Sequence, residues 1–459
     1  MASNEWLVAL LIAASLGRMG TSPRAIPLET RLPYVQQALP VRVGIAQYAQ
    51  AVKVVPGARA AVALECDDGT KSLTLAKGQA LFARPFDCAQ GRPQGDRISV
   101  EVQGGRIACR RVTITAPAAT RVCSWGVRSR EGTYRGDIEV VRDSSGTLSA
   151  VNVLPLEGYL EGVVAQEVPL TFHPEALKAQ AIIARTYALF TLGKHARQGF
   201  DLCDGMHCQQ YRGAVSDRRA LEAVRGTAGQ VLAYRGYLAE TVYHTTCGGF
   251  VDDAYRVWRG YLAPYLRARP DMPGGGNPTG WIEDEDQAAK FVHGEGFAYC
   301  ARGPRYRWTR SYTTGEVQRL LEANLPLLIG AGNAPGRLID MVTDGRSPGG
   351  RVQTLRIVTD SGQFEIRRDA MRWLFGDGKA GPDGLPSTLF CLRTERDHDG
   401  SLARLVFEGA GWGHGLGLCQ WGADGRARAG ARAPEILEYY YPGTRVIDLA
   451  AYDGRCEWE

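Results

Sequence analysis

The sequence lacks the features of a nucleic-acid-binding, membrane-spanning or repeat protein. Its 54 Lys and Arg residues exceed its 49 Asp and Glu residues by only five, and no block of consecutive basic residues forms an arm for nucleic acid. The apolar run from Trp6 to Leu16 is too short to cross a bilayer as a helix. There is also no solenoid repeat and no long low-complexity tract. These absences make nucleic acid a poor candidate ligand and favour a globular chain.

The composition is that of a globular protein large enough for two or three core units. The 459 residues are 44% hydrophobic and 22% charged, and 56 glycines favour a turn-rich fold that contains β-structure. Residues 1–25 hold the short apolar run, which fits a signal-peptide core, although Glu5 and the absence of Lys or Arg before it depart from the usual pattern. We therefore expect an exported protein of the cell envelope or extracellular space. A buried N-terminal helix is the alternative.

Eleven cysteines are many for a cytosolic chain and an odd number for one that is fully paired. Cys66, Cys88, Cys109 and Cys123 cluster in one N-terminal region and are candidates for disulfide bridges, because such bridges persist outside the cytosol. Their connectivity does not follow from the sequence.

Short alternating stretches separated by Gly, Asp and Pro predict a small β-rich module over residues 41–118. A second group of strands follows, in which the segment from Asp143 to Gly146 has the composition of a hairpin turn. Further along, "RVQTLRIVTD" and "GQFEIRR" predict another hairpin, and Thr313 with Glu316 predicts a capping box before a helix. The Gly- and Pro-rich passage within about 259–310 predicts a loop insertion.

Prolines mark two consecutive helices in the centre of the chain. Pro155 and Pro169 bracket a short one, and Pro174 is placed to begin a longer one with His173 as its N-cap. In the longer helix one apolar stripe is expected to pack, while Lys178 and Arg185 lie on another face.

Glu167, between these helices, is the first candidate for chemistry. An acid just before a helix N-terminus is stabilised as the anion by the helix dipole, so a simple capping charge is one interpretation. The apolar neighbours in "GVVAQEVPL" favour the other, because they would desolvate the carboxyl and raise its pKa toward that of a general acid. Glu157 and Glu161 are rival acids, but their i, i+4 spacing predicts one solvated face.

The segment "HARQGFDLCDGMHCQQY" holds His195, Cys203, His207 and Cys208. Two thiolates and two imidazoles suit a tetrahedral zinc ion, and the compact spacing of Cys203, His207 and Cys208 would preset three of the ligands. A disulfide or two buried free cysteines remain alternatives.

Two further motifs lie nearer the C-terminus. In "VYHTTCGGF", His244 and Cys247 raise the possibility of a Cys/His nucleophile pair, although a structural role is the commoner one and no orienting partner is evident. In "GAGWGHGLGLCQWGA", glycines permit close approach of a ligand, tryptophans offer faces to sugar rings, and His414 and Gln420 offer polar groups to hydroxyls. A turn-rich core connection is the alternative for this loop.

Taken together, these motifs resemble the stage II sporulation protein D family, which includes amidase-enhancer proteins. The segments "VNVLPLEGYLEGVVAQEVP", "EALKAQAIIARTYAL", "CDGMHCQQYRG", "YHTTCGGF" and "GWGHGLGLCQWGADGRARAG" occur in the order typical of that family. The resemblance covers residues 119–447 and implies an α+β chain: the small β module, then a mixed α/β catalytic domain with a central helix, a cleft and loop insertions. Residues 448–459 would form a tail.

The resemblance also implies a function. It indicates a peptidoglycan lytic transglycosylase whose catalytic acid is Glu167, with Lys178, Gln180 and Arg185 lining the glycan cleft and a structural zinc ion on His195, Cys203, His207 and Cys208. Glycan strands, and in some relatives an amidase, would be the partners. The alternative is a peptidoglycan-binding enhancer of an amidase without catalysis of its own. A zinc hydrolase is a weaker idea, because it needs an open metal position.

Overall fold

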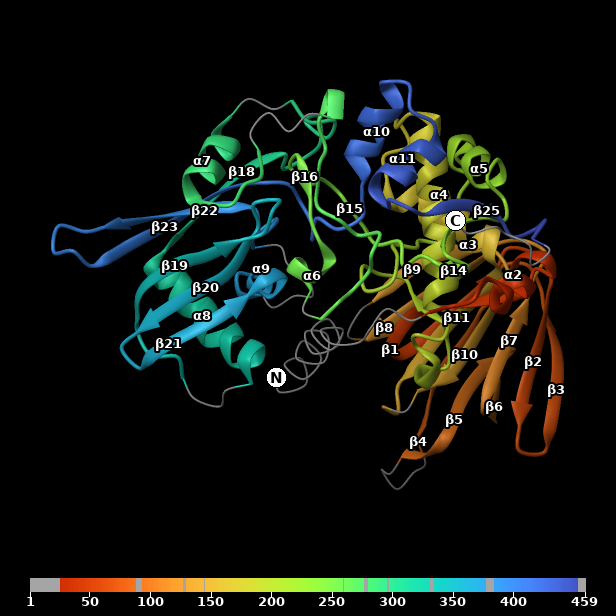
Figure 1. Ribbon diagram of the computed structural model, residues 1–459. Helices are drawn as coiled ribbons and strands as arrows, with labels where there is room; N and C mark the ends of the chain where they lie inside the picture. The colour runs from red at the N-terminus through yellow and green to blue at the C-terminus, as the bar shows by residue number, and fades with distance from the viewer. Residues whose placement is uncertain are drawn as a thin grey trace. The chain divides into compact units, whose positions relative to one another are not determined.

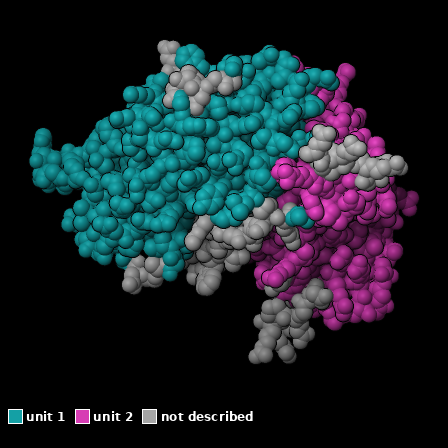
Figure 2. Space-filling model, viewed as in Figure 1, with its two compact units in different colours: residues 1–25, 240–445 teal, residues 26–239, 446–459 magenta. Residues whose placement is uncertain are grey.

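The structure is a computed structural model that describes residues 25–87, 93–126, 129–143, 145–258, 260–275, 280–294, 297–330, 334–376 and 384–452. The chain divides into two compact units, coloured separately in Figure 2: unit 1 comprises residues 1–25 and 240–445, and unit 2 comprises residues 26–239 and 446–459. Nearly all of the expected signal segment, as well as Cys88 and most of the expected tail, lies outside the described residues.

Unit 2 is built on a twelve-stranded sheet (Figure 1). Its main path runs in the order β3-β2-β7-β10-β11-β1-β4-β5-β6, while β8, β9 and β12 pair off this path. The strands are β1 (Pro40–Pro56), β2 (Ala60–Cys66), β3 (Gly69–Leu75), β4 (Leu81–Asp87), β5 (Pro93–Val102), β6 (Gly105–Cys109), β7 (Arg111–Thr115), β8 (Thr120–Gly126), β9 (Arg130–Tyr134), β10 (Asp137–Arg142), β11 (Leu148–Pro155) and β12 (Leu202–Cys203).

The long strand β1 organises this sheet because its two halves have different partners. Its first half pairs antiparallel with β11, and register shifts interrupt the ladder around Ala46. Its second half pairs with both β4 and β8, so that Val52 lies opposite Ala83 on one side and Ser124 on the other. The predicted hairpin is confirmed, because β10 and β11 pair antiparallel around the turn in which the Asp143 carboxylate accepts the Ser145 and Thr147 N–H groups.

Helices α3 (Leu156–Glu167) and α4 (Pro174–Thr191) follow the sheet, as the prolines predicted. α3 ends at Glu167 because the next residue precedes Pro169 and is held in an extended conformation. α4 begins at Pro174, and the imidazole of His173 accepts the Glu175 N–H as its N-cap. α4 packs against α3, α5 (Arg218–Arg225) and β13 (Gln230–Tyr234), and all but a few of its residues are buried.

The other elements of unit 2 are short. They are η1 (Leu28–Arg31), α2 (Leu32–Gln36), η2 (Ala196–Gln198), β14 (Tyr237–Leu238) and β25 (Arg445–Asp448), of which β14 and β25 flank β13 in a small sheet. Residues of β25 from Val446 onward belong to this unit.

One part of unit 1 has a regular core. Helix α8 (Thr314–Ile329) contributes Val317, Leu321 and Leu325 to a buried cluster that also takes side chains from two three-stranded sheets. Thr313 and Glu316 form the predicted capping box of α8. The sheets are ordered β18-β23-β22 and β19-β20-β21, with β18 (Arg307–Thr313), β19 (Leu338–Arg346), β20 (Val352–Thr359), β21 (Gly362–Arg367), β22 (Phe390–Arg396) and β23 (Leu402–Ala410). The predicted hairpin of β20 and β21 is confirmed.

The remainder of unit 1 consists mostly of loops and very short elements. These are β15 (Tyr243–His244), β16 (Phe250–Val251), α6 (Ala254–Val257), β17 (Arg269–Pro270), η3 (Pro273–Gly275), α7 (Glu285–His293), η4 (Arg368–Ala370), α9 (Met371–Leu374), β24 (Leu418–Cys419), α10 (Gln420–Arg428) and α11 (Ala433–Tyr440). β15 pairs with β24 and β16 with β17, each over two residues a strand. Helix α10, which begins inside the Gly-rich motif, was not predicted from the sequence.

The structure agrees with the predicted α+β class but divides the chain elsewhere than at residues 118 and 119. Strands on both sides of that point belong to the one large sheet, because β8, β9, β10 and β11 pair with β1 or with each other. The region expected as one domain over 119–447 is instead shared between the two units, whose boundary falls after Ala239. Among the described helices, none has both the length and the apolar character needed to cross a membrane.

Candidate active site and metal centre

Glu167 is the last residue of α3 and lies seven residues before the start of α4. This position corrects the capping-charge interpretation, because at a helix C-terminus the macrodipole disfavours a negative charge. The side chain is half-buried, and its Oε1 accepts the backbone N–H of Gln210 at 2.6 Å. The next residue, Val168, is buried. A carboxyl in this setting has one oxygen fixed by the backbone and remains in reach of solvent.

The loop that supplies Gln210 is fastened to both helices and to the sheet. The Tyr159 hydroxyl on α3 donates to Gln209 Oε1 at 3.2 Å, and the Gln209 amide donates to the carbonyl of Ala184 on α4 at 3.4 Å. Tyr211 donates its hydroxyl to Asn152 Oδ1 on β11 at 2.7 Å. The N–H that holds Glu167 is therefore placed by side chains on either side of it.

Close packing on α3 explains a glycine in the middle of that helix. A Cβ on Gly162 would lie 2.5 Å from the Tyr211 ring and 2.6 Å from the carbonyl oxygen of Gly213. Glycine lowers helix propensity, yet here it lets the loop approach the helix surface.

The rival acids of α3 form ion pairs, and the solvated face predicted for them is only partly confirmed, because the Glu157 side chain is 39% exposed whereas that of Glu161 is mostly covered. Glu157 accepts two hydrogen bonds from the Arg185 guanidinium at 2.8 and 2.6 Å. Glu161, whose side chain is 13% exposed, pairs with Arg135 at 3.1 Å and Arg225 at 3.6 Å. Both carboxylates therefore stabilise the packing of neighbouring segments.

The three residues predicted to line a glycan cleft differ in their surroundings. The Lys178 side chain is 39% exposed and pairs with Glu175 at 2.7 Å. Gln180 is 1% exposed, and neither its amide nitrogen nor its amide oxygen has a hydrogen-bond partner. The Arg185 side chain is fully buried against Glu157 and also donates to the Gln230 carbonyl, so the structure places it in the interior of unit 2.

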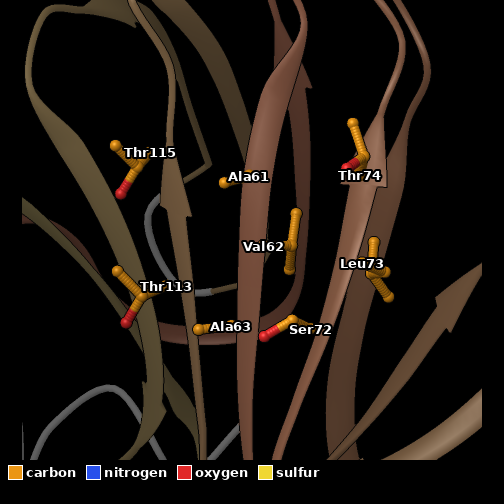
Figure 3. Close-up of a pocket in the computed structure, with 8 residues that line it drawn as sticks. All are labelled: Ala61, Val62, Ala63, Ser72, Leu73, Thr74, Thr113 and Thr115. Atoms are coloured by element: carbon orange, nitrogen blue, oxygen red, sulfur yellow. The ribbon is translucent and has the colours of Figure 1, made fainter.

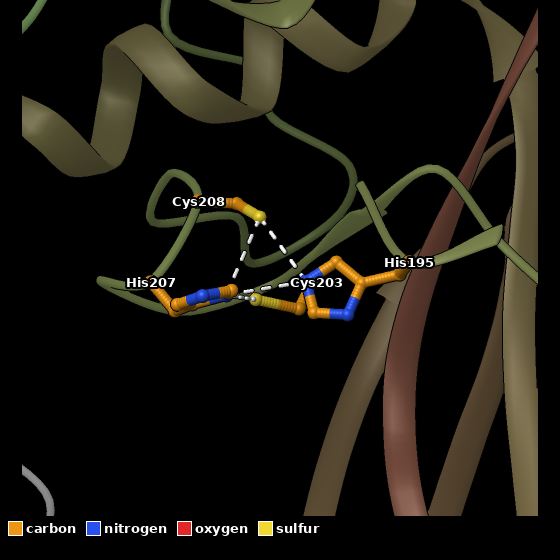
Figure 4. Close-up of side chains that lie close together, drawn as sticks. All are labelled: His195, Cys203, His207 and Cys208. Atoms are coloured by element: carbon orange, nitrogen blue, oxygen red, sulfur yellow. Dashed lines mark hydrogen bonds between the residues drawn. The ribbon is translucent and has the colours of Figure 1, made fainter. Parts of the chain in front are cut away.

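Beside the loop that holds Glu167, the four predicted metal ligands converge (Figure 4). The Nε2 of His195, the Nδ1 of His207 and the sulfurs of Cys203 and Cys208 all lie within 4.8 Å of one another. His195 Nε2 lies 3.2 Å from His207 Nδ1 and 3.4 Å from Cys208 Sγ, and Cys203 Sγ lies 3.8 Å from His207 Nδ1. All four residues that the sequence pattern predicted as ligands therefore lie together in the structure.

These separations fit a tetrahedral zinc ion. Nitrogen and sulfur ligands about 2.0–2.3 Å from a tetrahedral centre lie roughly 3.3–3.8 Å from one another. The other ring nitrogen of His195 contacts the Gln198 amide oxygen, which leaves Nε2 directed at the cluster. The donor set and its spacing thus fit the metal that the sequence analysis expected.

Electrostatics within the cluster favours a thiolate at Cys208. Burial opposes its ionisation, but hydrogen bonds with Cys203, His195 and His207 outweigh burial and lower its pKa well below the usual value. The hydrogen bond to Cys208, together with burial, raises the pKa of Cys203. Burial lowers the pKa of His207, so its imidazole is neutral, the form that ligates metals.

The other two predicted glycan contacts, His414 and Gln420, belong to unit 1. His414 is half-buried, and both of its ring nitrogens are engaged: Nε2 donates to the Tyr243 carbonyl and Nδ1 accepts the Leu416 N–H, each at 3.0 Å. Gln420, the first residue of α10, is 5% exposed. For His414 the geometry is that of the satisfied histidine that the sequence analysis held as its alternative.

A shallow pocket elsewhere on unit 2 lacks groups for chemistry. Figure 3 shows it on strands β2, β3 and β7. Its lining consists of Ala61, Val62, Ala63, Ser72, Leu73, Thr74, Thr113 and Thr115. Without an acid, a base or a thiol among them, these residues do not compete with Glu167 as a catalytic site.

Sequence reasoning missed one constellation, which lies in unit 1. Cys247, Asp271, Cys300 and Cys419 bring their donor atoms within 4.8 Å of one another, and all four are buried. Of these only Cys247 was singled out, as half of a Cys/His pair. No local spacing signals the set, because its members are spread from residue 247 to residue 419.

No disulfide joins any of the nine cysteines that the structure describes. Cys66, Cys109 and Cys123, expected as bridge candidates, are therefore free thiols here. Burial raises the pKa of Cys109 to about 12, which keeps that thiol protonated and unreactive.

Comparison with known proteins connects this site to a family. A family model described as stage II sporulation protein matches residues 144–234, which contain both Glu167 and the Cys/His cluster. A second model, a domain of unknown function (DUF8618), matches residues 252–417.

Curated relatives extend this similarity over most of the chain. Stage II sporulation protein D of Bacillus subtilis is 27% identical over 319 residues, covering 66% of this chain and 77% of the relative. An uncharacterised protein of Brachyspira hyodysenteriae is 29% identical over 304 residues, covering 66% and 69%. The amidase enhancer of Bacillus subtilis is 26% identical over 309 residues, covering 62% of this chain and 40% of that protein. The chain is therefore similar to members of the stage II sporulation protein D family, whose model matches its residues 144–234.

Proposed function

We propose that the protein is a peptidoglycan lytic transglycosylase that cleaves glycan strands in the cell envelope, with Glu167 as its acid and base. The observation that carries the proposal is the position of this carboxyl: half-buried at the end of α3, with Oε1 held by the Gln210 N–H at 2.6 Å. The two other acids of α3 are committed to ion pairs with arginines. A reaction that needs one carboxyl suits this arrangement.

The reaction begins with a protonated Glu167. Because Oε1 accepts the backbone N–H, the transferable proton is carried on Oε2. It passes to the oxygen that joins N-acetylmuramic acid to N-acetylglucosamine, while that bond breaks and positive charge develops at the muramic C1.

The ionised Glu167 then takes the proton of the muramic 6-hydroxyl. The 6-oxygen bonds to C1, which gives a 1,6-anhydro product and restores the protonated acid. No water is consumed, so no second carboxyl is needed to activate one. The Gln210 N–H stabilises the carboxylate between the two steps, because hydrogen bonds to an ionised acceptor are stronger than those to a neutral one.

A zinc ion on His195, Cys203, His207 and Cys208 would be structural. Four protein ligands leave no open coordination position for a water or a substrate. Its contribution would be to fix the loop that carries Gln209, Gln210 and Tyr211, and so the N–H that holds Glu167.

The second candidate function is a peptidoglycan-binding enhancer of an amidase that is not itself an enzyme. It is favoured by the similarity to the amidase enhancer of Bacillus subtilis, although this chain matches only 40% of that protein. Both candidates place the protein outside the cytosol on glycan strands, and both are compatible with an amidase partner.

Mass spectrometry of purified glycan strands separates the two. The strands are incubated with the parent protein, with Glu167→Gln, and with Glu161→Gln as a control on the same helix. We expect anhydro-muramic ends from the parent and the control, and a loss of about 10²–10⁴-fold in Glu167→Gln, the usual contribution of a general acid–base group. Circular dichroism establishes that each variant is folded.

Two outcomes would reject the transglycosylase. Cleavage by Glu167→Gln at the parental rate removes this residue from the chemistry. Binding of glycan by all three proteins without anhydro ends indicates the enhancer instead.

A further inference from the structure

Four potential metal ligands meet in unit 1 from four separate segments. Cys247 lies three residues after β15, Asp271 directly follows β17, Cys300 comes after α7, and Cys419 ends β24. Each of these residues is 0% exposed. Three thiols and a carboxyl share one buried space. Because water is excluded there, any charge on these groups must be stabilised by other protein groups or by a cation.

The distances within this group match tetrahedral coordination. Cys247 Sγ lies 3.4 Å from Cys300 Sγ and 3.3 Å from Asp271 Oδ2, and all four donor atoms lie within 4.8 Å of one another. Sulfur and oxygen ligands of one tetrahedral ion are separated by roughly 3.3–3.8 Å. The observed spacing is that of ligands around a common centre.

Backbone N–H groups are directed at two of the sulfurs. Cys419 Sγ accepts the N–H of Cys247 at 3.1 Å and that of Gly422 at 3.3 Å, and Cys247 Sγ accepts the N–H of Gly249 at 3.3 Å. Such donors stabilise a thiolate, which is the form of cysteine that binds metals.

Glycines make these approaches possible. Gly248 and Gly249 have φ of +80° and +118°, values that favour glycine and fold the chain back over Cys247. A Cβ on Gly422 would run into Asp271 Oδ2 and the Tyr440 hydroxyl. The glycines of the "CGG" and "CQWG" motifs therefore allow the close packing around the cysteines.

Asp271 is oriented by partners on its far side. Its Oδ1 accepts Arg426 Nε at 3.0 Å and the Tyr440 hydroxyl at 2.9 Å, whereas Oδ2 faces Cys247. Carboxylate ligands of metals are commonly fixed in this way by hydrogen bonds to the oxygen that does not coordinate. The Arg426 guanidinium balances one negative charge, and a divalent cation would balance two more.

We propose that Cys247, Asp271, Cys300 and Cys419 form a second metal site, which binds one zinc-class divalent cation through three sulfurs and one oxygen. Thiolates select soft or borderline metals such as zinc over magnesium or calcium. Four protein ligands and complete burial make the site structural, with no position for a reacting water.

This site would stabilise the part of unit 1 that has little regular structure. Its ligands lie up to 172 residues apart in the sequence, and the strands next to them, β15, β16, β17 and β24, pair over only two residues each. A metal that joins four such segments supplies folding free energy that the short strands do not. The proposal is independent of the proposed function, because the Cys/His cluster and Glu167 belong to unit 2.

The test is the metal content of the purified full-length protein and three variants, measured by inductively coupled plasma mass spectrometry. Cys300→Ser removes one ligand of the second site, and Cys208→Ser removes one ligand of the Cys/His cluster. Cys391→Ser is the matched control, a half-buried cysteine of unit 1 on β22. We expect Cys300→Ser to hold one equivalent less than the parent, Cys391→Ser to match the parent, and Cys208→Ser to retain one equivalent.

A second measurement decides the matter if Cys300→Ser does not fold. Cys208→Ser is loaded with cobalt(II), and the intensity of the near-ultraviolet thiolate-to-cobalt charge-transfer band should correspond to three thiolate ligands. The proposal is overturned if Cys208→Ser binds no cobalt, if Cys300→Ser keeps the full metal content, or if thiol titration of the denatured, unreduced protein finds Cys247 and Cys300 joined as a disulfide. Loss of metal in Cys300→Ser alone, with Cys208→Ser unchanged from the parent, supports this site and rejects zinc at the Cys/His cluster.

Discussion

Arg185 and Glu167 show how differently two charged residues on neighbouring helices can be used. The Arg185 side chain is fully buried in a two-bond pair with Glu157, which joins α4 to α3. Removing one member of such a pair leaves the other charge without a partner. Arg185 therefore contributes to the stability of unit 2. Glu167 instead stays half-buried at the helix end, in reach of solvent, which is compatible with the acid role proposed for it.

Gln180 gives a prediction about stability. Its amide is buried without a hydrogen-bond partner, which costs about 1–3 kcal/mol for a neutral polar group. Gln180→Met keeps a similar volume and removes the polar atoms, so we expect the free energy of unfolding to rise by roughly that amount. Urea denaturation followed by circular dichroism measures it.

The matched control is the same substitution at Gln209. That residue is also buried, but its amide forms hydrogen bonds with the Tyr159 hydroxyl and the Ala184 carbonyl. Because Gln209→Met removes these hydrogen bonds, it should lower the free energy of unfolding. If Gln180 also contacts glycan, Gln180→Met will lower the rate of glycan cleavage while it raises stability. A fall in stability at Gln180 would mean that its amide is satisfied in solution.

At the scale of elements, the loop after β12 connects the Cys/His cluster to the proposed acid. It contributes His207 and Cys208 to the cluster, which Cys203 joins from the end of β12, and two residues after Cys208 the N–H of Gln210 donates to Glu167. Burial is the main cause that raises the pKa of the Tyr159 hydroxyl, and Cys208, Cys203 and Glu167 lie near enough to raise it further in their ionised forms. The cluster and the acid therefore share one small region of unit 2.

If the Cys/His cluster binds zinc as proposed, removal of that ion should loosen this loop. Without a cation, the four ligands no longer hold residues 195–208 together, so the amide of Gln210 should exchange its hydrogen faster with solvent. Hydrogen–deuterium exchange on peptides covering residues 203–213, before and after treatment with a chelator, tests this directly. We also expect glycan cleavage to fall and to recover when zinc is added back.

Peptides from α8 provide the internal reference, because this helix lies in unit 1 and contributes to a separate hydrophobic core. Equal exchange of residues 203–213 with and without chelator, in protein shown to have lost its metal, would contradict a structural role for the cluster. If glycan cleavage is lost while hydrogen exchange of residues 203–213 is unchanged, the zinc hydrolase becomes a candidate function again.

At the scale of the whole molecule, the half-buried His414 and the buried His244 of unit 1 predict how stability depends on pH. Desolvation, aided by Arg372 and Arg351, lowers the pKa of His414 to about 3, and burial lowers that of its neighbour His244 to about 4. His414 Nδ1 already accepts the Leu416 N–H, so a proton there would break that bond. Both rings are therefore neutral in the folded protein.

An unfolded histidine takes up a proton near pH 6.5, whereas these folded ones do so only near pH 4 or below. Their contribution to stability is thus complete above about pH 6.5 and is lost as the pH falls toward their folded pKa values. We expect the Tm of unit 1 to fall between pH 7 and pH 5, and to fall less in His414→Gln. Differential scanning calorimetry at the two pH values measures this difference.

His293→Gln is the comparison for this experiment, since the His293 side chain is 56% exposed and pairs only at the surface with Glu408. Its pH dependence should match that of the parent. Identical slopes for His414→Gln and the parent would show that His414 is not held neutral by the fold.

The sequence by itself determined those features that depend on residues close together in the chain. Pro174 fixes the start of α4 because proline lacks the N–H that a first helical residue leaves unbonded, and Thr313 with Glu316 satisfies the first N–H groups of α8. The Asp143 turn is equally local. The Cys/His cluster was visible for the same reason, because its four members lie within 14 residues.

Only the tertiary structure decided the features that depend on distant partners. The sequence pattern predicts that the helix face with Lys178 and Arg185 is exposed to solvent. In the structure, segments from elsewhere in the chain cover Arg185 completely. Likewise Asp271 and Cys300 carry no local pattern, and they meet Cys247 and Cys419 only after unit 1 has folded. Burial and ligand sets of this kind arise from packing between segments far apart in sequence, which spacing and propensity do not record.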